Sequence, residues 1–279
     1  MACGIPSINK LARLAFGGAQ VILNNNPTVS GGSLQACSNP QLSCQNTTTV
    51  ENLCCFNHPG GQLLLTQFWD THPPTGPEDS WTIHGLWPDH CDGTFDASCD
   101  HRRNHRNITQ ILRAFGKHEL LTDMHMYWKD WKGNDEYLWQ HEFSKHGTCI
   151  STLNPECYDE YEPTQEVPEF FQRAVDLFKD LPTYQWLAEA GIEPSWTKRY
   201  TVHEIQAALS KHRNGSTVTL GCRRGALDEI WYHFNVRGSA QYGQYLASDP
   251  DGMKSRCPDF GIKYLPKSTG RVVGSTKRR

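Results

Sequence analysis

The chain has 279 residues, enough for one large domain, or for one domain with loose ends. Hydrophobic residues make up 37% and charged residues 20%, which suits a soluble globular protein, and no apolar run is long enough for a membrane span. The formal net charge of −3 provides no global positive field to attract a polyanion. This balance argues against a protein that coats RNA stoichiometrically and is compatible with an enzyme that has a local site.

The cysteines indicate an oxidising compartment. There are 11 of them, widely and irregularly spaced, without the short C-x-x-C pairs that usually mark zinc sites. Such spacing is typical of disulfide frameworks in exported proteins. Three glycosylation sequons, at Asn46, Asn107 and Asn214, agree with that interpretation. We therefore expect a glycoprotein that is secreted or held in a vacuole-like or lysosome-like compartment.

Residues 1–36 are predicted to be a leader or a disordered extension. The apolar run at 14–23 follows basic residues, but two glycines and a glutamine interrupt it, unlike the core of a standard signal peptide. Residues 24–36 are rich in Asn, Pro, Ser and Gly and are interpreted as a linker. Cys3 is then the unpaired cysteine, and the folded domain begins near Cys37.

Strand and helix patterns follow in order. Short apolar runs predict strands at 62–69 and 81–86, the second of them stopped by Pro88. The pattern becomes helical at 106–127. A further helix is predicted at 137–147, with Gly147 in the role of C-cap.

The second half begins with clearer helical signals. Pro168 suits the first turn of a helix whose apolar positions have the spacing i, i+3, i+4 and i+7. These positions are Phe171, Ala174, Val175 and Phe178. Thr201 and Glu204 form a capping-box pattern at the start of another helix.

Two β-rich runs, 217–222 and 229–236, are expected to be neighbouring strands. Residues 263–279 are predicted to be a disordered basic tail. We see no internal repeat and no second domain, so the fold class is α+β.

Two segments contain the residue types that catalysis needs: WTIHGLWPD at 81–89 and WQHEFSKHGTC at 139–149. On a helix, His141 and Lys145 are i, i+4 neighbours, as are Glu142 and His146, and the two rows adjoin. A charged helix surface of ion pairs is the plain alternative for the second segment. That alternative weakens because the first segment also holds a histidine, His84, framed by tryptophans and a turn.

Metal chemistry is the next alternative. The zincin pattern H-E-x-x-H places two imidazoles one helical turn apart. Here His141 and Glu142 are followed by Lys145 in the position of the second ligand, and an ammonium group would repel a metal ion. We therefore expect no metal and no cofactor. A metallohydrolase would instead lose its activity with a chelator.

Two histidines, a lysine and a glutamate suit the cleavage of RNA. The ribose 2′-hydroxyl is a built-in nucleophile, so the reaction needs one base and one acid, and histidine with a pKa near ~6.5 serves in either role. Lys145 could balance the negative charge of the transition state. DNA lacks the 2′-hydroxyl and should not be cut.

Both segments resemble the two active-site boxes of the T2-type ribonucleases, and the likeness extends from about Cys37 to Cys257, closest to the fungal branch. The resemblance implies a catalytic domain at 37–262 with a central antiparallel sheet flanked by several helices and stapled by disulfides. It also implies an endoribonuclease that cleaves single-stranded RNA with little base specificity, through a 2′,3′-cyclic phosphate to 3′-phosphate ends. A monomer is the default expectation.

The roles of the residues are implied by the same resemblance. His146 is the expected general base and His84 the general acid, and the two swap roles when the cyclic phosphate is hydrolysed. Glu142 and Lys145 would stabilise the transition state, with Lys145 and His141 on the phosphate side. A different hypothesis is a T2-like fold whose work is binding, as in signalling or toxicity. The intact catalytic set favours an enzyme.

Base recognition is carried over from the same family. Trp87, Asp89 and Phe95 match its first base site, where Asp89 would accept a hydrogen bond from an exocyclic amine. Gln67 is similar to a contact of the second base. Three other aromatic residues of the boxes are expected in the core: Trp81, Trp139 and Phe143. The family likeness also implies the bridges Cys37–Cys55, Cys44–Cys91, Cys54–Cys157, Cys99–Cys149 and Cys222–Cys257.

Overall fold

The computed structural model describes residues 33–45 and 50–267. The predictions made for residues 1–32, including Cys3, for Asn46 and for residues 268–279 lie outside this range. In the part of the chain that is described, no helix is both long and apolar enough to cross a bilayer.

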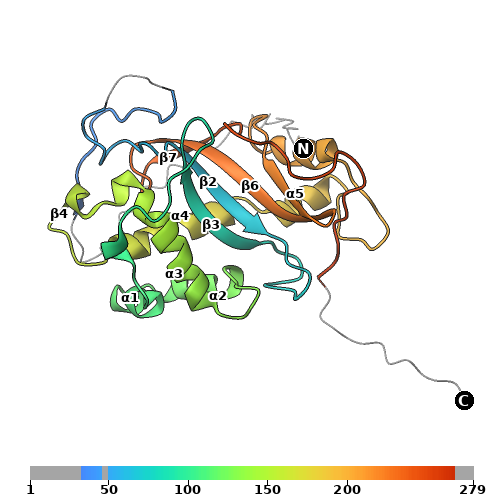
Figure 1. The fold of residues 1–279 in the computed structure, drawn as a ribbon, viewed down its shortest axis with the longest axis horizontal. Coiled ribbons are helices and arrows are strands. Elements are labelled where there is room, and N and C mark those ends of the chain that lie inside the picture. Colours follow the sequence, from blue (N-terminus) through green and yellow to red (C-terminus); the bar gives the residue numbers. More distant parts are fainter. Residues whose placement is uncertain (1–32, 46–49, 268–279) are drawn as a thin grey trace, which may run out of the picture. The chain divides into compact units, whose positions relative to one another are not determined.

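A five-stranded antiparallel sheet forms the centre of the fold (Figure 1). Its strands are β2 (Gln62–Phe68), β3 (Thr82–Asp89), β5 (Thr219–Arg223), β6 (Ala226–Arg237) and β7 (Gln244–Ala247). The order is β3-β2-β6-β5, and β7 also pairs with β6. The inner strand β2 is covered on both faces, since Leu63, Leu64 and Leu65 are all fully buried. Strand β3, at the free edge, is the one that contains the first histidine box.

Helices cover the sheet, and one of them, α3, contains most of the second histidine box. They are α1 (Ile108–Ala114), α2 (His118–Tyr127), α3 (Asp135–Lys145), α4 (Glu166–Lys179), α5 (Thr183–Glu189) and α6 (Val202–Ser210). Short 3₁₀ turns are η1 (His101–Arg103), η2 (Gly147–Cys149), η3 (Ser151–Leu153) and η4 (Pro155–Cys157). Helix α4 packs on β2 and β3 and also against α1 and α2, which Figure 1 shows beside α3. The α+β class and the antiparallel sheet are confirmed.

The helix signals in the second half are confirmed. All four apolar positions predicted for α4 are buried, because the 3.6-residue period turns them toward the sheet. At α6 the hydroxyl of Thr201 accepts from the N–H of Glu204, whose carboxylate accepts from the N–H of Thr201, so the capping box is complete.

Two predicted boundaries are wrong. Pro88 does not stop its strand, because β3 continues to Asp89 and Pro88 pairs with Leu63. An edge strand tolerates proline where the missing N–H has no partner to lose. Gly147 is not the C-cap of α3, a position that His146 occupies with φ −113°. Gly147 begins η2 instead, and a Cβ there would lie 2.8 Å from the ring of Phe143, so glycine is required for close packing.

The folded part extends beyond both predicted ends. Residues Ser33–Leu34 form β1, which pairs with β4 (Tyr158–Asp159), so the predicted linker reaches too far. On the C-terminal side, Tyr264 is fully buried and its hydroxyl accepts from the indole N–H of Trp81 at 3.0 Å. The buried ammonium of Lys267 donates to three backbone carbonyls of the loop at 75–80. Residues 263–267 therefore belong to the domain, because their side chains complete its packing.

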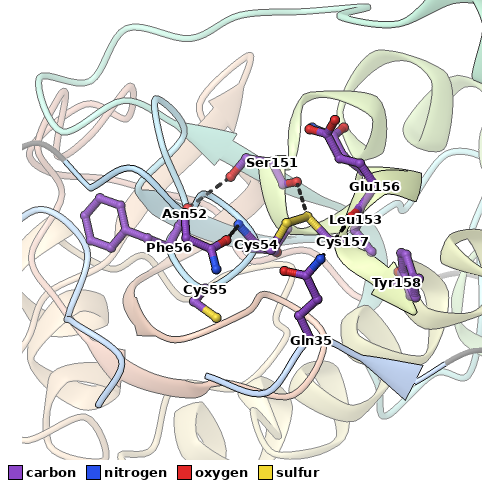
Figure 2. Close-up of a disulfide and its surroundings, with 12 residues drawn as sticks. Gln35, Asn52, Cys54, Cys55, Phe56, Ser151, Leu153, Glu156, Cys157 and Tyr158 are labelled. Carbon is purple, nitrogen blue, oxygen red and sulfur yellow. Dashed lines mark hydrogen bonds between the residues drawn. A yellow bond between two sulfur atoms is a disulfide. The ribbon is translucent and has the colours of Figure 1, made fainter. Parts of the chain in front are cut away.

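The structure contains the five disulfides that the family resemblance implied. Figure 2 shows the bridge between Cys54 and Cys157, with Gln35 and Ser151 beside it. This bridge joins residues 103 positions apart. Two other bridges, Cys44–Cys91 and Cys99–Cys149, shorten the route between its ends to three segments of ten, eight and eight residues.

Candidate active site

The two histidine boxes meet at the free edge of the sheet. His84 lies on β3, Glu142 on α3, and His146 at the end of α3, where its N–H donates to the carbonyl of Glu142 at 3.0 Å. The His84 Nε2 atom is 3.6 Å from Glu142 Oε1. The Trp87 ring contacts both histidines: it lies edge-on to the ring of His84, with ring centroids 4.6 Å apart, and is stacked on the ring of His146, with centroids 5.0 Å apart. Residues about 60 positions apart thus form one group.

Two side chains hold the imidazole of His84, and a third holds its backbone. Its Nδ1 hydrogen-bonds Glu229 Oε1 at 2.8 Å, and Phe68 stacks on its face with ring centroids 3.8 Å apart. Trp128 donates to its backbone carbonyl at 2.8 Å. The ring remains partly exposed, with a side-chain exposure of 20%, so Nε2 can reach a substrate.

Glu142 is a fully buried carboxyl. Its Oε2 accepts from the indole N–H of Trp87 at 2.8 Å, while Oε1 has no hydrogen-bond partner among the described residues. Burial raises the pKa of Glu142, and the nearby His84 and the Trp87 N–H partly oppose this shift. Gly85 makes room for the group, because a Cβ there would lie 1.9 Å from Glu142 Oε2. The arrangement favours the protonated form of this carboxyl more than exposure to water would.

His146 is a buried neutral imidazole. Burial, together with the positive charges of Lys145 and His84, lowers the pKa of its ring to about 2. Its Nε2 atom is buried and finds no hydrogen-bond partner in the described part of the chain. The ring is therefore unprotonated, which is the state that a general base needs before the reaction.

Lys145 and His141 lie on the outer side of the group. His141 is exposed and Lys145 is half-buried. Desolvation lowers the pKa of His141, and the charge of Lys145 lowers it further. The structure thus brings all five predicted residues into one cluster, with Lys145 and His141 on its solvent side.

The base-site candidates separate into two groups. Trp87 is part of the catalytic cluster, and Asp89 pairs in an isolated bridge with Phe95, whose ring is 59% exposed. Burial raises the pKa of Asp89 to about 7. Gln67 does not reach the site, because its side chain is fully buried and bonded to the carbonyl of Leu181 and the hydroxyl of Thr183. The three aromatic residues assigned to the core are buried as predicted.

The alternation along β2 explains why Gln67 is excluded. Successive side chains of a strand point to opposite faces, so Phe68, the next residue, faces the site and stacks on His84. Sequence reasoning missed Phe68 and Glu229. The signal for Phe68 was its place next to Gln67 in a predicted strand, whose side chains alternate between faces, but a glutamate in the β-rich run at 229–236 gave none.

A cavity of about 250 Å³ opens beside His84 and Glu142. Its walls include Phe68, Trp131 and Arg223, and Trp131 is 53% exposed. A larger cavity of about 800 Å³ is lined by Pro88, His90 and other residues outside the catalytic group, so volume alone does not locate the site. The smaller cavity is the one that borders His84, His141 and Glu142.

Fold and site together define an acid–base enzyme: two histidines around a buried carboxyl, held on a disulfide-linked α+β frame. Residues 60–242 match the family model described as the Ribonuclease T2 family. Ribonuclease Trv of Hypocrea rufa is 60% identical over 230 residues, which cover 82% of this chain and 97% of that protein. A Ribonuclease T2-like protein of Emericella nidulans is 50% identical over 97% of this chain and 65% of its own length.

A solved structure agrees. The crystal structure of Actibind, a T2 ribonuclease, has a TM-score of 0.82 and 50% identity, and the match covers 85% of this chain and all of that one. The chain therefore belongs to the Ribonuclease T2 family, with relatives in the fungi, and it is a T2-type endoribonuclease.

Proposed function

We propose that the protein cleaves single-stranded RNA without a metal ion, by transesterification to a 2′,3′-cyclic phosphate and then hydrolysis to a 3′-phosphate. The observation that carries this proposal is the contrast between its two histidines. His146 is buried and neutral, whereas His84 is flanked by the carboxyl groups of Glu142 and Glu229. One imidazole is prepared to accept a proton and the other to donate one.

In the first step His146 takes the proton of the 2′-hydroxyl, and the 2′-oxygen bonds to phosphorus. The bond from phosphorus to the 5′-oxygen breaks, and His84 protonates that oxygen. In the second step His84 takes a proton from water, whose oxygen bonds to phosphorus, and His146 returns its proton to the 2′-oxygen as the bond between that oxygen and phosphorus breaks. Such proton transfer typically contributes about 10²–10⁴ in rate.

Glu142, Lys145 and His141 act on the charge of the phosphoryl group. Because burial raises the pKa of Glu142, its carboxyl is protonated more readily than an exposed one, and Oε1 in that form would donate to a phosphoryl oxygen. The ammonium of Lys145 and, when protonated, His141 supply positive charge on the solvent side. Lys145 in the position of a second zinc ligand is what favours chemistry without a metal.

Base binding is proposed for Trp87, Asp89 and Phe95. An exposed aromatic ring such as Phe95 can stack on any base, which suits low specificity. Since the pKa of Asp89 is about 7, its carboxyl is protonated in acid and can donate as well as accept. The cavity beside His84 lies where the leaving nucleoside would bind, and Trp131 is the aromatic side chain there.

We also propose export to an oxidising compartment, as a monomeric glycoprotein. Five disulfides support the compartment. Asn107 and Asn214 are both exposed, so their sequons are open to modification.

The test is cleavage of matched RNA and DNA strands in excess EDTA, with analysis of the early products. We expect RNA alone to be cut and a 2′,3′-cyclic phosphate to accumulate before the 3′-phosphate. His84→Phe and His146→Phe should each abolish turnover and leave a folded protein. Dependence on a divalent ion, equal cutting of DNA, or a nearly active variant would refute the mechanism.

A further inference from the structure

Glu229 makes the only direct hydrogen bond to the His84 ring among the described residues. Its Oε1 lies 2.8 Å from His84 Nδ1, whereas Glu142 Oε1 stays 3.6 Å from Nε2. Glu229 comes from β6, two strands away from β3, so this bond crosses the face of β2.

The sheet is built to hold this carboxylate in place. Glu229 pairs with Phe68 on β2 and with Gly221 on β5. A Cβ at position 221 would lie 2.9 Å from the Cβ of Glu229 and 3.1 Å from its Oε2, so only glycine leaves room for the observed side chain. Phe68 in turn stacks on the face of His84. Both cross-strand neighbours of Glu229 therefore support its contact with the histidine.

Other charged and titratable groups face His84 from the elements packed around it. They are His141 and Glu142 on α3, His146 at its end, and Asp70 after β2, with Lys129, Arg223 and Asp228 along the adjoining cavity. Glu229 differs from all of these groups because it contacts Nδ1 of His84, whereas Glu142 lies near Nε2. With a side-chain exposure of 17%, its charge is only partly screened by water.

We propose that Glu229 is a positioning residue, which selects the tautomer of His84 and stabilises its protonated form. The inference rests on the proposed role of His84 as general acid. A carboxylate can only accept, so the proton on Nδ1 stays in place through the cycle, and Nε2 becomes the atom that exchanges protons with substrate. Nε2–H gives its proton to the 5′-oxygen as the bond from phosphorus to that oxygen breaks. The neutral ring then has a free Nε2 to accept a proton from water in the second step.

The key experiment compares two substrates whose leaving groups differ in their need for a proton. In a dinucleoside monophosphate the leaving group is the 5′-alkoxide of a nucleoside, which needs a proton from the general acid. In the 4-nitrophenyl ester of uridine 3′-phosphate the leaving group is a phenolate, which is stable without that proton. For Glu229→Gln we expect kcat/KM to fall about 10- to 100-fold on the dinucleotide, less than the full ~10²–10⁴ of acid catalysis. On the nitrophenyl ester the loss should stay below about 3-fold. The basic limb of the pH profile should also move to lower pH, because one negative charge beside the imidazolium is gone.

The matched control is Glu189→Gln, which removes a carboxylate from another pair with a histidine. Glu189 Oε2 lies 3.4 Å from His212 Nε2, and this pair contacts none of the catalytic group. The variant should keep wild-type kinetics on both substrates. A separate measurement follows the ¹⁵N shifts of the His84 ring. Nδ1 should stay protonated across the titration in the wild type, and Glu229→Ala should give a mixture of tautomers.

His84→Phe, measured in parallel, separates the two levels of the argument. If it still cleaves the dinucleotide at a near-normal rate, the assignment of His84 itself fails. If it is inactive while Glu229→Gln loses the same factor on both substrates or loses nothing, the proposed role of Glu229 is overturned. An unchanged tautomer in Glu229→Ala would overturn it as well.

Discussion

Gly85→Ala is the change that tests most directly how the buried carboxyl is held. The new Cβ would lie 1.9 Å from Glu142 Oε2 and 2.6 Å from Trp87 Nε1, the two atoms of one hydrogen bond. Ordinary contact needs about 3.5 Å, so the carboxyl must retreat by about 1.5 Å, which breaks that bond. The lost bond costs about 1.5–3 kcal/mol and the overpacking about 1–3 kcal/mol. We therefore expect a destabilisation of about 2.5–6 kcal/mol.

The effect on activity should be larger than this loss of stability explains. With Glu142 displaced from the phosphoryl group, kcat/KM should fall about 10²–10³-fold at a temperature where the variant is fully folded. Urea unfolding gives the first quantity and dinucleotide cleavage the second. Gly252→Ala is the control, since its new Cβ would meet nothing closer than 3.5 Å. A Gly85→Ala enzyme with wild-type turnover would show that the position of Glu142 does not matter.

Two further predictions concern stability. Replacing Cys54 and Cys157 with serine should lower the free energy of unfolding by about 3.5 kcal/mol, because the other bridges reduce the loop that this disulfide closes to about 26 residues. The full loop of 103 residues would instead give ~4.7 kcal/mol. Urea unfolding with the other bridges intact decides between the two values. Burial, with the charge of Arg213, lowers the pKa of His233 to about 3, so its stabilising neutral form is fully present above about pH 6.5 and is lost as the pH falls toward 3. The slope is at most about 1.4 kcal/mol per pH unit. In His233→Gln the pH dependence of the free energy of unfolding between pH 7 and 4 should decrease by up to the equivalent of one bound proton. An unchanged slope would show that His233 does not cause this dependence.

The sequence alone was sufficient to place Glu142 beside His146, because these two residues are close along the chain, whereas adding His84 from β3 to the group required the family resemblance. Glu142 and His146 are one helical turn apart, so helix geometry alone predicts that they meet. Glu229 could not be predicted in the same way, since its contact with His84 depends on the strand order, which brings β6 within reach of β3 across β2. Gln67 shows the opposite error. Moving by one residue along a strand places the side chain on the opposite face of the sheet. Only the pairing register of β2 therefore identifies Phe68, and not Gln67, as the residue that contacts His84.

The position of β3 at the edge of the sheet has a consequence for solubility. Within residues 33–45 and 50–267 no strand pairs with the outer side of the strand that contains His84, although Trp128 donates to the backbone carbonyl of His84, and residues 82–87 include no Lys, Arg, Asp or Glu. An uncharged open edge is a template on which another chain can add a strand and begin to aggregate. Pro88 removes a backbone donor near the end of this strand, and Asp89 adds a carboxyl there. The catalytic edge can thus stay accessible to RNA while it is less able to pair with a second copy of the protein.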